Sequence, residues 1–259
     1  MIPYFEVTTI ILGPLTLRVW GIFVAAGILS GAYLTYRLAK KYLLSEAVIG
    51  DLAIWALVGA FIGARVFYII FYNPAYFLQY PLDAFKIWQG GESSLGGFFG
   101  AAVAVYVFAK IRKLSWDNLL PYLDIGAVGL WLGWGIGRVG CFLIHDHVGT
   151  LSHFILAVNY PGGARHDLGL YDSILGFVLF AFSLIFYKRL AKYGSGFVAG
   201  VTFGLYAFVR FWLDFLRATD LSVIDVRYAG LTPAQWGMAA VFLTLTFLLI
   251  NSKILKRKI

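Results

Sequence analysis

Residues 119–149 read LLPYLDIGAVGLWLGWGIGRVGCFLIHDHVG, an apolar run long enough to enter a bilayer followed by a dense polar stretch. The side chains after the run are Arg138, Cys141, His145, Asp146 and His147. Ionisable groups are costly inside a bilayer and are kept there mainly for function. The stretch therefore predicts the chemical site, although a helix that leaves the membrane at an interfacial anchor arginine also fits.

The composition is that of an integral membrane protein. Apolar residues make up 61% of the chain, charged residues 13%, and the mean hydropathy is +0.81, whereas soluble domains are about half apolar and a quarter charged. The 259 residues suffice for roughly seven spans of about 20 residues. We therefore expect an all-α bundle of about seven transmembrane helices, with residues 1–259 forming one transmembrane domain.

The apolar segments are separated by short polar ones. They cover residues 17–38, 51–72, a third segment that ends near 110, then 119–137, 170–187, 197–216 and 233–250. Glycine-rich residues 88–100 either start the third span or form a re-entrant turn. Because Gly135, Gly137 and Gly140 allow the fourth helix to end or unwind, residues 138–168 are expected to form a loop that builds a small head and contains all four histidines.

Basic residues cluster after the first, third, fifth and seventh spans, at residues 37–41, 110–113, 188–192 and 253–258. Cytoplasmic flanks of spans are enriched in such residues. We expect a multi-pass protein of the plasma (cytoplasmic) membrane, with the N-terminus outside, the C-terminus in the cytoplasm and the head and active site toward the outer leaflet. The clusters also account for the net charge of +8, so nucleic acid is excluded as a partner.

Two arginines lie inside apolar segments, Arg65 in the second and Arg210 in the sixth. Arg210, Asp214 and Arg217 are spaced i, i+4, i+7 and would share one helical face with the acid between two cations. This stripe is either a structural ladder of ion pairs or an anion site. Arginine suits phosphate because two parallel N–H groups meet two oxygens.

Several ordered segments carry a resemblance to one family. Residues 137–149, GRVGCFLIHDHVG, resemble the signature G-R-x-G-N-F-x-N-x-E followed by G, with Arg138, Gly140, Phe142, Asp146 and Gly149 on it. LGPLTLRVWG at 12–21, GARVFYIIFYN at 63–73, GGESSLGGFFG at 90–100 and FVRFWLDFLR at 208–217 fit in order, as do residues 167–173 and 234–236. Along nearly its whole length the chain resembles the prolipoprotein diacylglyceryl transferase family.

The chain departs from the family pattern at several positions. Leu95 stands where the glycine-rich segment of the family has a histidine implicated in catalysis. Cys141 and Ile144 replace signature asparagines, Trp20 replaces a tyrosine, and the two acids are aspartates rather than glutamates. These changes fit either a divergent active enzyme or a lipid-binding pseudoenzyme. We favour activity, with His145 or His147 supplying the missing base.

The resemblance implies transfer of a diacylglyceryl group from phosphatidylglycerol to the thiol of the lipobox cysteine in a prolipoprotein signal peptide, forming a thioether and releasing glycerol phosphate. The attacked carbon is saturated, so neither a metal nor another cofactor is expected. A rival function, an anion transporter, explains the charges but not the ordered segments.

The resemblance also implies residue roles. Arg138 and Arg210 would stabilise the departing phosphate, and Asp214 would orient Arg210. Asp146 would orient Arg138 or a histidine, and His145, nearer Arg138, is preferred over His147 as the base. The residues assigned to substrate binding are Trp20, Arg65, Gly96, Gly97, Arg138, Cys141, Gly149 and Arg217. For Arg65 a structural role is an equal alternative, and Cys141 is also read as a buried apolar side chain.

Overall fold

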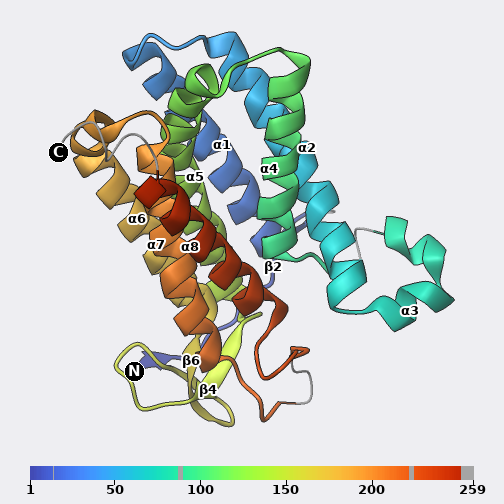
Figure 1. Ribbon diagram of the computed structural model, residues 1–259. Helices are drawn as coiled ribbons and strands as arrows, with labels where there is room; N and C mark the ends of the chain where they lie inside the picture. The colour runs from blue at the N-terminus through green and yellow to red at the C-terminus, as the bar shows by residue number, and fades with distance from the viewer. Residues whose placement is uncertain (14, 87–89, 222–224, 252–259) are drawn as a thin grey trace. The chain divides into compact units, whose positions relative to one another are not determined.

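The computed structural model describes residues 1–13, 15–86, 90–221 and 225–251 (Figure 1). Within these ranges, seven helices are long and apolar enough to cross a membrane, which confirms the predicted fold class. They are α1 (Val19–Lys41), α2 (Glu46–Phe71), α4 (Ser94–Ile111), α5 (Trp116–Ile144), α6 (Leu168–Leu190), α7 (Phe197–Leu213) and α8 (Pro233–Asn251). Short helical turns connect some of them: α3 (Pro74–Gln79), η1 (Pro81–Phe85), η3 (Ala191–Tyr193) and η4 (Asp214–Leu216).

Side-chain caps fix where several helices begin. The hydroxyl of Ser45 accepts a hydrogen bond from the N–H of Val48 at the start of α2, and Ser93 does the same for Gly96 at the start of α4. Each cap satisfies one of the backbone donors that a first turn leaves unpaired. The cap at Ser93 means that residues from Ser94 onward start the third span, as the first alternative has it, whereas residues 88 and 89 of that segment lie outside the described ranges.

The end of α5 differs from the prediction. The helix was expected to stop near residue 137, but it runs to Ile144 and ends where His145 adopts a positive φ of 50°. The glycines serve close packing instead of unwinding: a Cβ at Gly140 would collide with the Cβ of Phe23. Arg138 and Cys141 consequently lie one helical turn apart on the same helix rather than in a loop.

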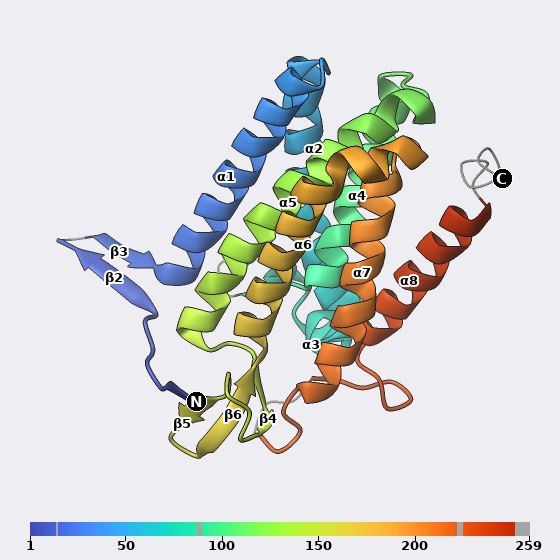
Figure 2. The same cartoon turned by 90° about the vertical axis from the view of Figure 1, so that its left-hand side faces the viewer.

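Strands form a small head at the ends of α5 and α6 (Figure 2). The sheet order is β1-β5-β6-β4, made by β1 (Ile2–Pro3), β4 (Val148–Leu151), β5 (Val158–Tyr160) and β6 (Gly163–Asp167). The predicted head is thus found within residues 148–167, with β1 added from the N-terminus. A separate antiparallel hairpin joins β2 (Thr9–Leu12) and β3 (Leu15–Arg18) before α1. That the head faces outward stays a prediction.

The chain divides into two compact units, each described by itself. Unit 1 comprises residues 1–38, 123–224 and 238–259, and unit 2 comprises residues 39–122 and 225–237. In unit 2, α2 and α4 lie side by side (Figure 1) and touch through glycines, since a Cβ at Gly63 would collide with Gly96 and Gly100. The expectation of one transmembrane domain over residues 1–259 stays a prediction.

In unit 1, α5 is fixed against two neighbours. A Cβ at Gly27 of α1 would collide with the carbonyl of Gly133 on α5, so the two backbones touch. Asp124, buried on α5, accepts hydrogen bonds from the N–H groups of Gly196 at 2.7 Å and Ala199 at 2.9 Å. A carboxylate there satisfies the first donors of α7 and complements its dipole. These contacts set the positions of α5 and α7, which carry the two central arginines.

Candidate functional site

Arg138 lies in the last turns of α5 with only 8% of its surface exposed. Its guanidinium stacks over the ring of Trp134, with Cζ 4.5 Å from the ring centroid. Its other contacts are long: Nε lies 3.7 Å from Oδ2 of Asp172, and Nη1 lies 3.8 Å from Sγ of Cys141. The charge of Arg138 is therefore balanced, but its donors are held loosely.

Arg210 lies in the last turn of α7 and is 4% exposed. Its Nε is 3.5 Å from Oδ1 of Asp172, and its Nη1 is 2.9 Å from Oδ1 of Asp214. Asp172, on α6, is 1% exposed and lies between the two arginines, one carboxylate oxygen toward each. Within the described part of the chain, neither oxygen of Asp172 accepts a hydrogen bond. A buried carboxylate held only by long ion pairs is unusual, because buried charge normally gains hydrogen bonds as well.

Asp214 pairs with two cations, as the sequence predicted, although the backbone is not the predicted continuous helix. The α-helix ends at Leu213, Asp214 begins η4, and Arg217 is extended. Oδ1 of Asp214 nevertheless lies 2.9 Å from Nη1 of Arg210 and 2.6 Å from Nε of Arg217. The tighter turn keeps the two arginines on the same carboxylate, so the predicted pairing is confirmed and the predicted single helical face is wrong.

Sequence reasoning did not single out Asp172. Its partners lie on α5 and α7, far from it in the sequence, so no local spacing reveals the pairing. The available signal was a carboxylate in the apolar segment LGLYDSILG at 168–176, because such a group inside a bilayer needs a buried partner. The three arginines and two aspartates together leave one net positive charge, which suits an anion.

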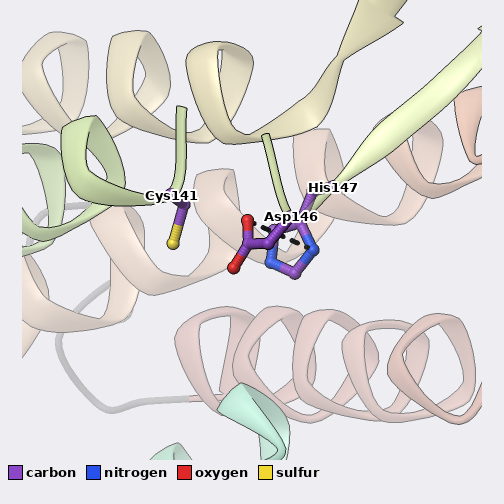
Figure 3. A group of neighbouring side chains, drawn as sticks. All are labelled: Cys141, Asp146 and His147. Carbon is purple, nitrogen blue, oxygen red and sulfur yellow. Dashed lines mark ion pairs between the residues drawn. The ribbon is translucent and has the colours of Figure 1, made fainter. Parts of the chain in front are cut away.

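Cys141, Asp146 and His147 form a second cluster (Figure 3). Arg138 adjoins it, because its Nη1 lies 3.8 Å from Sγ of Cys141. Nδ1 of His147 lies 3.7 Å from Oδ1 of Asp146, and their side chains are 24% and 34% exposed. Burial, reinforced by the charge of Arg138, holds the pKa of His147 well below its ordinary value. Burial raises the pKa of Asp146 to about 6, although Arg138 opposes the shift. At neutral pH the imidazole is therefore neutral and the carboxylate largely ionised.

His145 occupies a different environment from His147. It is buried, with Nδ1 2.6 Å from Oδ2 of Asp167 and Nε2 on the backbone carbonyl of Phe5. The hydroxyl of Tyr160 donates to the same oxygen of Asp167 at 2.7 Å. Both ring nitrogens of His145 thus face acceptors that tie the N-terminal segment to the head. This geometry favours His147 over His145 as the base, against our preference, because both ring nitrogens of His145 already face Asp167 and Phe5. The catalytic role of either histidine stays a prediction.

The remaining predicted residues fall into two groups. In unit 1, Trp20 hydrogen-bonds Cys141, and Gly149 packs so closely that a Cβ would meet the carbonyl of Leu216. In unit 2, Arg65 donates to the carbonyls of Asp83 at 2.7 Å, Ala84 at 3.0 Å and Gly91 at 3.1 Å, and also to those of Lys86 and Gly90. Arg65 was assigned either lipid binding or a structural role, and these contacts favour the structural role.

Gly96 and Gly97 also belong to unit 2, near the start of α4. Gly96 is buried, and a Cβ there would collide with Phe67 of α2. Gly97 has ordinary clearance, with the nearest atom 3.6 Å from a built Cβ. Gly96 is therefore required for helix packing, and the substrate-binding role that the sequence assigned to both glycines stays a prediction.

Buried arginines paired with carboxylates on neighbouring apolar helices indicate a membrane protein with a charged cluster that suits an anion. Comparison with known proteins identifies the family within this class of membrane protein. The family model for prolipoprotein diacylglyceryl transferase matches residues 7–251, and the chain belongs to that family.

Curated relatives support the assignment. The phosphatidylglycerol–prolipoprotein diacylglyceryl transferase of Nitrosomonas europaea is 32% identical over 245 residues, covering 90% of this chain and 85% of the relative. The protein of the same name from Rhizobium meliloti is 31% identical over 266 residues, covering 97% and 92%. That from Trichormus variabilis is 30% identical over 249 residues, covering 89% and 86%.

Proposed function

We propose that this protein transfers a diacylglyceryl group from phosphatidylglycerol to the lipobox cysteine of a prolipoprotein. The cysteine sulfur attacks the saturated glyceryl carbon that carries the phosphate ester. An S–C bond forms, the C–O bond to phosphate breaks, and glycerol phosphate leaves with the electron pair. The family match and the names of the relatives support the reaction, and the buried Arg138–Asp172–Arg210 cluster is the observation that carries it.

The cluster is suited to the departing phosphate. Asp172 holds Arg138 and Arg210 together at 3.7 and 3.5 Å, beyond hydrogen-bond distance. A phosphate oxygen at 2.7–2.9 Å, about the length of a charge-assisted hydrogen bond, would offer either guanidinium a closer acceptor. Negative charge grows on that phosphate as the C–O bond breaks, so the arginines stabilise the transition state more than the bound lipid. Arg217 and Asp214 complete the constellation by fixing the position of Arg210.

Thiolate formation is assigned to His147 and Asp146. An ordinary thiol has a pKa of about 8.5 and is mostly protonated at neutral pH. The neutral imidazole of His147 offers a lone pair, and Asp146 at 3.7 Å sets its orientation. Both lie directly after α5, beside Cys141 and within reach of the field of Arg138. This pair stands in for the family histidine that Leu95 replaces.

The active site is proposed to face the outer leaflet of the cytoplasmic membrane. The basic clusters at 37–41, 110–113 and 188–192 support this orientation. In a Cys141→Ser background, a cysteine at exposed Ile155 on the head should react with an impermeant thiol reagent added outside cells. A cysteine at exposed Leu43, after α1, should react only after lysis. The reverse labelling pattern contradicts the orientation.

The function is tested with purified protein in phosphatidylglycerol vesicles and a synthetic lipobox peptide. Mass spectrometry should detect a thioether-linked diacylglyceryl peptide, and a peptide with serine in place of the cysteine should remain unmodified. Binding of the lipid without any thioether product would instead identify a pseudoenzyme, the alternative that Leu95 raises.

A further inference from the structure

Three side chains with different donor atoms meet at the C-terminal end of α5, where Cys141 lies in the last turn of the helix and Asp146 and His147 follow it. Sγ of Cys141, a carboxylate oxygen of Asp146 and a ring nitrogen of His147 all lie within 4.8 Å of one another (Figure 3). Sulfur, nitrogen and oxygen ligands of this kind are those of Zn²⁺. Bond lengths of about 2.0–2.3 Å to the ion place two tetrahedral ligands roughly 3.3–3.8 Å apart. The His147 and Asp146 atoms are already 3.7 Å apart. Because Sγ of Cys141 lies within 4.8 Å of both residues, a movement of about 1 Å brings it to the distance of a third ligand.

We propose that Cys141, Asp146 and His147 bind a Zn²⁺ ion whose fourth position takes the thiol of the lipobox cysteine. The inference rests on the proposed function and deepens it, since it names how the thiolate is made. When zinc is bound, the lone pair of His147 forms a bond to the metal, so the metal and not the imidazole acidifies the thiol; this replaces the expectation from the sequence that no metal takes part. Three protein ligands with one open position are characteristic of catalytic rather than structural zinc sites. A thiol that coordinates zinc is deprotonated outright, so the metal performs the step that the absent family histidine would otherwise serve.

The charges permit a cation here despite the neighbouring arginines. Arg138, Arg210 and Arg217 are already paired with Asp172 and Asp214. A Zn²⁺ ion bound by the thiolate of Cys141 and the carboxylate of Asp146 forms a centre with no net charge, and the thiolate of the substrate in the fourth position would make it negative. Solvent reaches the cluster through the partly exposed side chains of Asp146 and His147, at 34% and 24%, which provides a path for the ion and for the released proton.

The chemical step balances without any redox change. The S–H bond of the substrate thiol breaks on coordination, and the proton leaves to water at the exposed side of Asp146. The zinc-bound sulfur then forms its bond to the glyceryl carbon, and the phosphate departs with the electrons of the broken C–O bond toward Arg138 and Arg210. The product sulfur is a thioether, which binds zinc more weakly than a thiolate does. The lipidated peptide is therefore released from the metal more readily than the substrate thiolate.

The sequence supports the inference independently of the distances. Of the three ligands, Cys141 replaces a signature asparagine, Asp146 replaces a glutamate, and His147 is an added histidine. These departures coincide with Leu95, where the family histidine is absent. The chain therefore carries three side chains of the kinds that bind zinc at positions where it departs from the family pattern.

The test uses the purified full-length protein in detergent, stripped of metal and titrated with Co²⁺, whose bond to a thiolate gives a near-ultraviolet charge-transfer band. We expect one Co²⁺ per chain with this band, and a stronger band when lipobox peptide adds a second thiolate. Cys141→Ser should abolish the band, and His147→Ala should weaken binding by at least about tenfold, since even outer partners of metal ligands are worth that much. His153→Ala, which removes an exposed histidine outside the cluster, should change nothing.

Asp146→Asn preserves side-chain size and should also weaken Co²⁺ binding. It keeps the test informative if Cys141→Ser or His147→Ala fails to fold. No band, or a band that survives Cys141→Ser, overturns the site. Transfer activity separates the two proposals. Loss in chelator and recovery with Zn²⁺ supports the metal, whereas full activity in chelator overturns it and leaves the transferase function standing. A Cys141-dependent band without any thioether product leaves the site standing and rejects the transferase function.

Discussion

Arg65 and Arg210 are both buried arginines in apolar helices, at 8% and 4% exposure, yet each is held differently. Arg65 donates to backbone carbonyls, three of them at 2.7–3.1 Å. Arg210 is paired with carboxylates, one of which, Asp172, lies at 3.5 Å. Carbonyls occupy the donors of Arg65 without cancelling its charge, whereas Asp172 balances the charge of Arg210 without occupying its Nε–H. The first arrangement fits a structural arginine, and the second fits one that binds a substrate anion.

Removing Arg210 should have the largest effect. Arg210→Ala deletes one arm of the phosphate site and leaves Asp172 and Asp214 without one of their cations. We expect transfer to fall by about 10³-fold or more, since loss of one transition-state donor alone costs about 10²–10³. Arg210→Lys should remain poor, because an ammonium cannot make two parallel contacts. Rates are measured in vesicles, with circular dichroism to confirm folding. A folded alanine variant with near-normal rate would make this ion-pair cluster structural.

His147→Ala should have the next largest effect, a loss of roughly 10²–10⁴. The wild-type rate should fall as the pH drops through about 6, where Asp146 gains a proton. The variant should instead recover as pH rises toward the thiol pKa of about 8.5, because the substrate then ionises unaided. Rates between about pH 5 and pH 9 decide this. His145→Ala is the matched comparison: it should lower the melting temperature by loosening the Phe5 and Asp167 contacts, and retain the wild-type pH profile.

Much of this arrangement follows from the sequence, and the failures have physical causes. Hydropathy located all seven spans because each is a continuous apolar run. It misplaced the end of α5 because glycine permits both unwinding and close helix contact, and only the neighbour, here Phe23 against Gly140, decides between them. His145 and His147 could not be ranked because the partners of His145, Phe5 and Asp167, are remote in sequence.

Asp172→Asn should have a smaller effect on transfer than loss of an arginine. The substitution keeps the shape but removes the charge that Arg138 and Arg210 share. Arg138 then loses the carboxylate of Asp172, whereas Arg210 keeps its pairing with Asp214. The two arginines should still retain the anionic lipid but repel each other more strongly, so we expect kcat to fall roughly tenfold to hundredfold. Breaking a buried ion pair should also destabilise the fold by about 3 kcal/mol. Kinetics at several lipid densities and thermal unfolding measure both effects. Unchanged kcat with lowered stability would mean that Asp172 only supports the fold.

The smallest effect on transfer is expected at Arg65, which makes it the sharpest test of the comparison. Arg65→Lys keeps the positive charge but cannot reach the carbonyls of both Asp83 and Gly91, which are partly buried. The acceptors left unpaired should cost about 1 kcal/mol each, the low end of the range for such groups. The melting temperature should drop by several degrees, while the rate per folded molecule at 25 °C stays within about twofold of wild type. Arg37→Lys, at an exposed arginine bonded to Tyr33, is the matched control and should change neither quantity. A raised KM for phosphatidylglycerol with unchanged stability would mean that Arg65 binds lipid. Hydrogen bonds from an arginine to backbone carbonyls would then no longer distinguish a structural arginine from a functional one.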